Sequence, residues 1–178
     1  MSIRRAAPER DAAACAAIYA PYVRQGATSF EESPPSADEM AARMTRLAAT
    51  HPWLVEERAG RVVGYAYSSE HAPRAAYRWA VDVAVYVDAA HLREGVGRRL
   101  YEALFERLRA QGFRMACAGI TLPNQSSVGL HEAFGFLPVG VYRRVGWKAG
   151  AWRDVGWWQL DLAPGQEGPL PEPGPPSG

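Results

Sequence analysis

Apolar residues alternate with small or polar residues between Trp79 and Val87, and this period of two predicts a strand. One face of that strand carries Trp79 and four valines, whereas the other carries one carboxylate, Asp82, and one phenol, Tyr86. Shorter patterns of the same kind predict strands over residues 3–6, 113–120, 136–142 and 152–162, and a hairpin of residues 53–55 and 62–67 around Ala59-Gly60-Arg61.

Elsewhere the apolar residues recur every third or fourth position, which predicts helices. One helix begins at Ser36, because Ser36 and Glu39 form a capping box in which each side chain accepts the other's backbone N–H. A second, over residues 97–111, repeats leucine at every fourth position and ends at Gly112. Helices are also expected over residues 9–24 and 124–134. The order β-α-α-β-β-β-α-β-α-β-β predicts an α/β protein with a mixed sheet.

The composition places these elements in one domain. The chain has 178 residues, 48% of them hydrophobic and 22% charged, which is typical of a globular protein. Residues 164–178 contain six prolines and four glycines, so we expect a disordered tail there and a folded domain over residues 1–163.

Charge and cysteine content narrow the function classes. The net charge of +1 excludes a chain built mainly for nucleic-acid binding, and no apolar run approaches the roughly 18 residues that span a membrane. Cys15 and Cys117 form neither a disulfide framework nor a zinc-type spacing. We therefore expect no metal site and a reducing, cytoplasmic setting.

The turn between strand 79–87 and helix 97–111 carries the most chemistry. Gly95 and Gly97 allow a ligand to approach the backbone, and the first N–H groups of a helix lack partners and carry partial positive charge. This combination predicts a phosphate or pyrophosphate site, with a ligand-free tight turn as the alternative. The turn has no Gly-Lys-Ser/Thr and no third glycine in Rossmann spacing, which excludes a P-loop and argues against a dinucleotide fold.

Two motifs together resemble the GNAT N-acetyltransferase superfamily. Gly95 and Gly97 match that family's Gln/Arg-x-x-Gly-x-Gly/Ala loop, although Leu92 stands where Gln or Arg is usual. Residues 124–136, Asn-Gln-Ser-Ser-Val-Gly-Leu-His-Glu-Ala-Phe-Gly-Phe, are similar to the family's Asn-x-x-(Ala/Ser)-x-x-Leu-Tyr-x-x-x-Gly-Phe. Segments such as Pro52-Trp53-Leu54-Val55 and Asp154-Val155-Gly156-Trp157-Trp158 resemble the phosphinothricin N-acetyltransferase branch, and the similarity extends over residues 1–163.

This resemblance implies the GNAT acyl-CoA N-acyltransferase fold, with a mixed, mostly antiparallel central sheet flanked by helices. It implies direct transfer of an acetyl group from acetyl-CoA, in a ternary complex, to the amino group of a small amino-acid analogue of the phosphinothricin, methionine sulfoximine or arsinothricin type. It also implies a homodimer formed through the C-terminal strands. Two alternatives stay open: another acceptor, such as a polyamine, an antibiotic amine or a protein N-terminus, or a non-catalytic acyl-CoA-binding sensor.

The resemblance also assigns residues to acetyl-CoA. The pantetheine arm would pair with Val85 and Val87 like an added strand, a backbone N–H near Val85 would stabilise the oxyanion, and the glycine turn would hold the pyrophosphate. The full set of predicted coenzyme contacts is Val85, Tyr86, Val87, Arg93, Glu94, Gly95, Val96, Gly97, Arg98, Asn124 and Ser127.

Asp82 and His131 are the candidate catalytic residues. Asp82 is a carboxylate inside an apolar strand, where burial would raise its pKa and make it a better base. The resembled branch carries Glu there, so the carboxylate is set back by about 1.5 Å, a gap that one water molecule bridges. His131 stands where many GNAT enzymes have a tyrosine facing the CoA sulfur, and is the candidate acid for the leaving thiolate. The structural alternatives are a solvated strand residue or an ion pair with a nearby arginine for Asp82, and a packing or capping role for His131.

For the substrate, Arg74 is the candidate cation, because a guanidinium binds a carboxylate or phosphinate through two parallel hydrogen bonds. Phe30, Tyr77 and Tyr86 are the candidate pocket walls. The alternative cations, possible contributors across a dimer interface, are Arg143, Arg144 and Lys148.

Overall fold

The computed structural model describes residues 1–168 and 170–176. The helices are α1 (Pro8–Arg24), α2 (Ala37–Leu47), α3 (Val96–Gln111) and α4 (Gln125–Ala133), with short 3-10 turns η1 (Ala75–Tyr77) and η2 (Ala89–His91). The strands are β1 (Ser2–Arg5), β2 (Trp53–Arg58), β3 (Arg61–Glu70), β4 (Ala80–Val87), β5 (Met115–Leu122), β6 (Leu137–Lys148) and β7 (Ala151–Asp161). The predicted order of elements is therefore confirmed.

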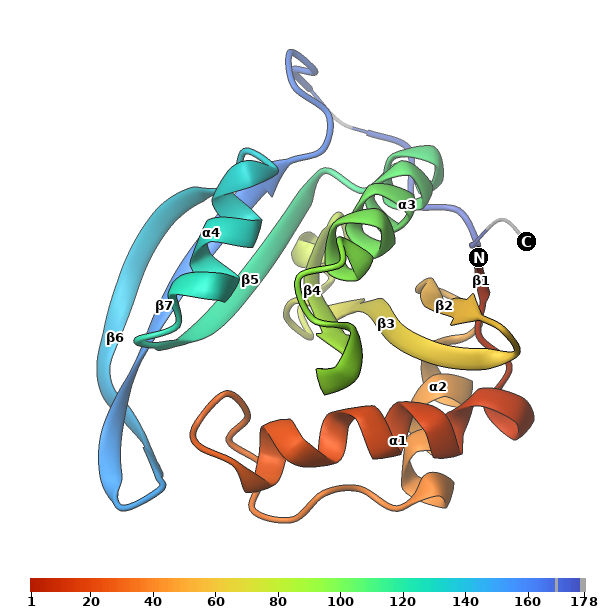
Figure 1. Cartoon of the computed structure of the whole chain (residues 1–178). Helices are drawn as coiled ribbons and strands as arrows, with labels where there is room; N and C mark the ends of the chain where they lie inside the picture. Colours follow the sequence, from red (N-terminus) through yellow and green to blue (C-terminus); the bar gives the residue numbers. More distant parts are fainter. Residues whose placement is uncertain (169, 177–178) are drawn as a thin grey trace.

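The strands form one sheet in the order β1-β2-β3-β4-β5-β7-β6, in which only the β4–β5 pair is parallel. The predicted mixed, mostly antiparallel sheet is thus confirmed. Most element bounds agree within two residues, but β6 continues to Lys148 instead of ending at Tyr142. Residues 146–148 pair only with the start of β7, so the β6–β7 hairpin extends beyond the end of β5 (Figure 1).

Helices cover both faces of the sheet (Figure 1), and a hydrophobic core lies between the sheet and each layer of helices. On one face α3 packs through Leu100, Leu104 and Leu108, which are all fully buried. Each such leucine contributes about 2 kcal/mol of hydrophobic free energy. On the other face α1 and α2 pack against the aromatic side of β3, with Met40 and Tyr65 among the most buried side chains. The sheet therefore lies between two separate layers of helices.

The predicted helix ends are also confirmed. The Ser36 hydroxyl accepts the Glu39 N–H at 3.1 Å, and the Glu39 carboxylate accepts the Ser36 N–H at 2.7 Å, which completes the capping box of α2. Gly112 ends α3 with a φ of 91°, a left-handed conformation that favours glycine. None of the helices described here is long and apolar enough to cross a membrane.

The disordered tail over residues 164–178 stays a prediction, and residues 169, 177 and 178 lie outside the described residues. The part of the tail that is described contacts the folded body. The Gln111 side-chain amide donates to the Gly174 carbonyl at 2.8 Å, and the Gly174 N–H donates back to the Gln111 carbonyl at 2.8 Å. The Trp79 indole N–H donates to the Pro171 carbonyl at 2.8 Å.

Candidate active site

The parallel strands β4 and β5 part at the centre of the sheet. Their pairing consists of three positions and ends at Asp82 and Cys117, although β4 continues to Val87 and β5 to Leu122. A cavity of about 80 Å³ lies where they diverge. It is lined by residues 83–86 of β4 and 118–121 of β5, together with Thr28, Tyr101, Asn124, Ser127 and His131. The unpaired backbone of β4 gives this slot an edge that an extended ligand can join like a strand.

The N-terminus of α3 lies against the same slot. Gly95 precedes the helix with a φ of 76°, and α3 begins at Val96. A Cβ built on Gly97 would lie 3.7 Å from Val87 Cγ2 and 3.8 Å from Val85 Cγ2. The first turn of α3 therefore packs on the valine side chains of the part of β4 that does not pair with β5. The free N–H groups and the positive end of the helix dipole there have the chemistry that suits an anion, and their role in binding a diphosphate stays a prediction.

One member of the predicted coenzyme edge is already engaged. The Tyr22 hydroxyl of α1 donates to the Val87 carbonyl at 2.7 Å. The backbone near Val85 therefore offers the freer position for an extended arm.

A buried ionic network that the sequence analysis missed supports the loop before α3. Glu56 of β2 is fully buried, and its carboxylate accepts hydrogen bonds from Arg99 at 2.8 and 3.1 Å and from Arg58 at 2.9 Å. Arg99 also donates to the Glu94 carbonyl at 3.0 Å, while the Glu94 carboxylate is bound by Arg58 and His91. A glutamate following Trp53-Leu54-Val55 was the one available signal of this network.

The charged side chains predicted to hold the coenzyme have other partners or lie in solvent. The Arg98 guanidinium donates to Glu102 at 3.0 Å, and the Glu94 side chain takes part in the network below the loop. Arg93 is exposed and has a φ of 63°. The anion site therefore depends mainly on backbone N–H groups.

His131 lies at the inner wall of the slot. Its Nδ1 donates to the Ser127 carbonyl at 2.7 Å, so its Nε2 accepts from the Tyr101 hydroxyl at 3.0 Å. Burial lowers the pKa of His131, which favours the neutral imidazole over the imidazolium that the sequence analysis expected. Its role as the acid stays a prediction. Tyr101, which also lines the slot, was not among the predicted residues.

Asn124 caps α4, as predicted, by accepting the Ser127 N–H at 3.1 Å. Both residues line the slot near its α4 side. They are therefore placed where they can contact a ligand that extends from the α3 N-terminus into the slot.

Asp82 lies on the opposite face of the sheet, on the side of α1 and α2. Its partner is not an arginine, because the Asp82 Oδ1 lies 2.6 Å from the Nδ1 of His71. Burial raises the pKa of Asp82 and the His71 hydrogen bond opposes that effect, with a net rise. His71 is a functional candidate that the sequence analysis missed, because it follows β3 and nothing in the sequence links it to β4.

Cys117 completes a small cluster with this pair. Ligand atoms of His71, Asp82 and Cys117 lie within 4.8 Å of one another, the one such group of three among residues 1–168 and 170–176. Burial raises the pKa of the Cys117 thiol to about 11, so the protonated form persists at neutral pH and is a poor metal ligand. The absence of a metal stays a prediction.

The predicted substrate residues are divided between two places. Tyr77, on η1, packs edge-on against His71 with ring centroids 6.0 Å apart. Arg74 at the start of η1 is exposed, and its guanidinium has no hydrogen-bond partner among residues 1–168 and 170–176. Tyr86 is packed edge-on among Tyr19 and Tyr22 on the same face as Asp82. The ring of Phe30 lies over Gly146 of β6.

Two of the three alternative cations already have partners for their side chains. Arg143 donates to Asp154 at 3.2 Å, whereas Arg144 uses only its backbone N–H, which donates to the same carboxylate at 2.8 Å. The Lys148 ammonium is bonded to the Glu31 carbonyl.

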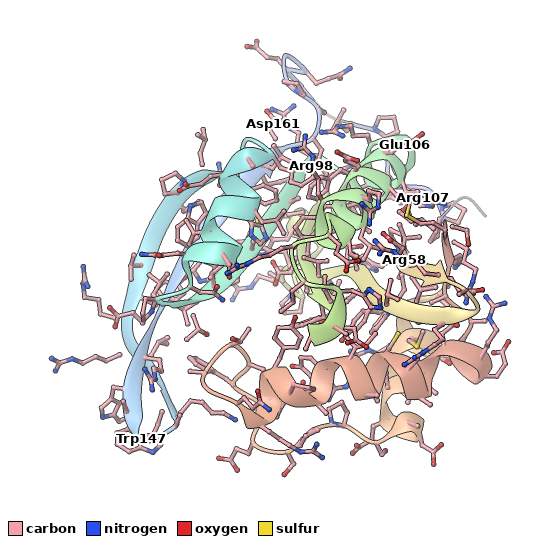
Figure 2. All side chains as sticks on the ribbon, viewed as in Figure 1. Arg58, Arg98, Glu106, Arg107, Trp147 and Asp161 are labelled. Carbon is pink, nitrogen blue, oxygen red and sulfur yellow. The ribbon has the colours of Figure 1, made fainter. Side chains whose placement is uncertain are left out.

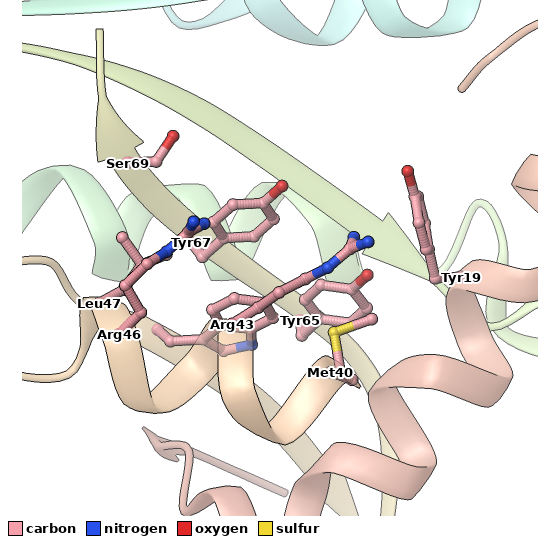
Figure 3. A pocket seen from close by; sticks show the side chains of 9 residues that line it. Tyr19, Met40, Arg43, Arg46, Leu47, Tyr65, Tyr67 and Ser69 are labelled. Atoms are coloured by element: carbon pink, nitrogen blue, oxygen red, sulfur yellow. The ribbon is translucent and has the colours of Figure 1, made fainter. Parts of the chain in front are cut away.

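A second hollow of about 160 Å³ lies between α2 and β3 (Figure 3). It is bordered by Arg43, Arg46, Tyr67 and Ser69, and Ser69 pairs with Asp82 in the β3–β4 register. The guanidinium of Arg43 is held by Glu31 through bonds of 2.7 and 2.8 Å. The hollow therefore adjoins the Asp82 side of the sheet and has a basic rim.

Comparison with known proteins decides the family. Residues 4–157 match the family model described as an acetyltransferase (GNAT) domain. The chain belongs to the GNAT acetyltransferase family. The predicted GNAT fold is confirmed, and acetyl-CoA is the co-substrate of this family of enzymes.

Relatives place the chain within that family. It is 41% identical over 158 residues to a phosphinothricin N-acetyltransferase of Streptomyces viridochromogenes, covering 89% of this chain and 86% of the relative. It is 37% identical to an L-methionine sulfoximine/L-methionine sulfone acetyltransferase of Pseudomonas aeruginosa, covering 86% and 90% of the two chains. The crystal structure of a phosphinothricin acetyltransferase from Sinorhizobium meliloti in complex with acetyl-CoA superimposes with a TM-score of 0.86 at 35% identity, covering 90% and 88% of the chains. The predicted resemblance to this branch is confirmed.

Proposed function

We propose that this GNAT enzyme acetylates the α-amino group of a small amino-acid analogue resembling phosphinothricin or methionine sulfoximine, by direct attack in a ternary complex. The observation that carries the proposal is the end of β4–β5 pairing at Asp82. At that point the slot that adjoins the α3 N-terminus meets the face that presents Asp82, His71 and η1. The names of the relatives support the substrate class.

The coenzyme half of the reaction uses mainly backbone. The diphosphate binds at the first turn of α3, and the pantetheine arm runs along β4 into the slot. A backbone N–H near Val85 donates to the carbonyl oxygen while it carries negative charge. The Tyr101 hydroxyl and His131, which are hydrogen-bonded at 3.0 Å, line the slot beside the leaving sulfur.

The acceptor half uses side chains. An aliphatic ammonium must lose a proton before it attacks the thioester, and the groups placed to assist that loss are Asp82 and its hydrogen-bonded partner His71. Arg74 binds the carboxylate or the anionic head of the substrate, because it is exposed and on the same turn as Tyr77. Its local environment supports this role better than those of Arg143 and Lys148, which already have partners.

We also propose a homodimer formed through β6 and β7. Their hairpin exposes many large apolar side chains, and an exposed apolar patch of this kind is typical of a protein–protein interface. Trp147 projects from the end of the hairpin (Figure 2). The exposed residues of this patch are Leu137, Val139, Val141, Tyr142, Val145, Trp147 and Trp152.

The dimer is tested by light scattering on the eluting protein. We expect twice the mass of one chain, and a shift to one chain's mass in the Trp147→Asp, Val141→Asp variant. A wild-type chain that elutes as a monomer at micromolar concentration contradicts the dimer.

Both cysteines are free, which supports a reducing, cytoplasmic location.

The substrate class is tested by coupled thiol release with acetyl-CoA and a panel of amines. The panel contains phosphinothricin, methionine sulfoximine, a polyamine, an aminoglycoside and a short peptide with a free N-terminus. We expect the highest kcat/KM for the two amino-acid analogues. Turnover of polyamine alone contradicts the substrate class, and acetyl-CoA binding without turnover of any amine leaves the acyl-CoA sensor.

A further inference from the structure

A histidine that was not among the predicted site residues lies beside the candidate catalytic residue Asp82. His71 is the residue after β3 ends, and its Nδ1 is 2.6 Å from the Asp82 Oδ1. This hydrogen bond lies at the level of the sheet where β4 and β5 begin to part. We propose that His71 Nε2 is the atom that takes the proton from the substrate ammonium, with Asp82 holding the ring and stabilising its charged form. This inference rests on the proposed acetylation of an amine.

The ring of His71 is held in one orientation. Tyr77 packs against it edge-on with ring centroids 6.0 Å apart, and Trp157 does so at 5.8 Å. Because a carboxylate only accepts hydrogen bonds, Asp82 fixes the His71 proton on Nδ1. Nε2 then carries the lone pair, and within residues 1–168 and 170–176 no group donates to it. This is the arrangement in which an aspartate orients an imidazole that acts as general base.

His71 is also accessible to a substrate. Its side chain is 28% exposed, and the neighbouring turn η1 carries Arg74 and Tyr77. An amino acid held by Arg74 has its amino group within a few bonds of its carboxylate, which keeps that group near the ring. The base and the anchoring cation thus lie on adjoining segments of the chain.

The chemistry favours an imidazole over a carboxylate as the acceptor. Imidazole is a stronger base than a carboxylate, with reference pKa values of about 6.5 and 3.9, so proton transfer from an ammonium is less uphill to imidazole by about 2.6 units. Burial raises the pKa of Asp82, which narrows this difference. The other titratable groups facing the ring are Tyr77 and Cys117, and Cys117 stays a thiol.

The proton balance of the step is complete. Nε2 takes one proton from the ammonium, and the freed nitrogen lone pair attacks the thioester carbonyl carbon. When the tetrahedral intermediate collapses, the C–S bond breaks and its electron pair leaves on sulfur. The second amine proton ends on that sulfur as CoA thiol, and the imidazolium returns its proton to solvent through its exposed side.

The inference is tested with His71→Gln, using the best amine from the panel. Glutamine keeps an N–H donor for Asp82 but has no basic nitrogen. We expect kcat to fall by about 10²- to 10³-fold, with the Kd for acetyl-CoA unchanged. His51→Gln, which alters a histidine stacked on Phe113, is the matched control and leaves kcat unchanged. If His71 only positioned Asp82, His71→Gln would keep kcat within a few-fold of wild type, and that result overturns the proposal.

Two rescue experiments separate chemistry from folding. In His71→Ala, added imidazole restores turnover in proportion to its concentration, whereas a structural defect is not restored in this way. In the His71→Gln background, Asp82→Glu extends the carboxylate by one methylene toward the amine and recovers part of kcat. Failure of both rescues in variants with wild-type melting temperature overturns the proposal, as does loss of wild-type activity in a chelator, which would assign the cluster to a metal.

The outcomes also distinguish this inference from the proposed function. A wild-type chain that binds acetyl-CoA but acetylates no amine refutes both. If the wild-type chain acetylates an amino-acid analogue and the His71→Gln variant does so at the same rate, only the inference is refuted.

Discussion

The two faces of the sheet at the β4–β5 divergence are built in different ways. The face that we propose for the coenzyme offers backbone groups, namely the free N–H groups of α3 and the open edge of β4, while most charged side chains nearby are paired with each other. The acceptor face uses side chains, because Asp82, His71 and Tyr77 converge from three different elements. A backbone site tolerates changes of side chain that a side-chain site does not, which explains how Leu92 can replace the usual Gln or Arg.

The largest effect is expected on the acceptor face. Asp82→Ala removes the group that orients His71 and leaves the slot intact, so kcat should fall by about 10²- to 10⁴-fold. The Kd for acetyl-CoA, measured by calorimetry, should stay within twofold of wild type. Unchanged turnover would exclude Asp82 from the proton path, and a large loss of coenzyme affinity would contradict the separation of the two faces.

The next effect concerns the support of the coenzyme loop. Glu56→Ala leaves Arg99 and Arg58 beside an empty, buried position, and removing one partner of a buried ion pair costs about 3 kcal/mol. We expect that loss in the free energy of unfolding measured with urea, together with weaker acetyl-CoA binding.

The matched control is Glu102→Ala, which removes the exposed i,i+4 partner of Arg98. Pairs of this kind contribute about 0.5 kcal/mol or less. If the two glutamate variants unfold at the same urea concentration, the network is not the support of the loop.

A smaller effect is expected from Gly97→Val. A Cβ at this position has contacts of 3.6 to 3.8 Å, which are ordinary, so the helix keeps its place. The added methyl groups narrow the space between α3 and Val85, and we expect the Kd for acetyl-CoA to rise about tenfold, or about 1.4 kcal/mol. Gly97→Ala should change the Kd less. An unaltered Kd in Gly97→Val would contradict the binding of the diphosphate at the first turn of α3.

The same contrast explains what could be predicted from the sequence. The order of elements followed from periods of two and 3.6, and the coenzyme loop from Gly95 and Gly97, because both signals are local. The hydrogen bond between His71 and Asp82 joins the residue after β3 to a residue of β4 eleven positions later, and nothing in either segment indicates it. The Tyr101–His131 contact and the burial of Glu56 depend in the same way on packing between distant segments.

The longer β6 has an equally physical cause. Residues 143–148 extend β6 without an alternating pattern, because both faces of this part of the hairpin are largely exposed. The packing of Phe30 was equally hard to predict, since Gly146 leaves a space on β6 that the Phe30 ring occupies, while its role as a wall of the substrate pocket stays a prediction. Glycine in a strand removes the side chain that would otherwise direct such packing.

The central claim is that free N–H groups of α3 hold the diphosphate and direct the thioester into the slot between β4 and β5. A crystal structure of the complex with CoA tests it most directly. We predict diphosphate oxygens within hydrogen-bond distance of the N–H groups of residues 96–98, with the sulfur between β4 and β5 near Tyr101. A coenzyme bound outside this slot would contradict the account.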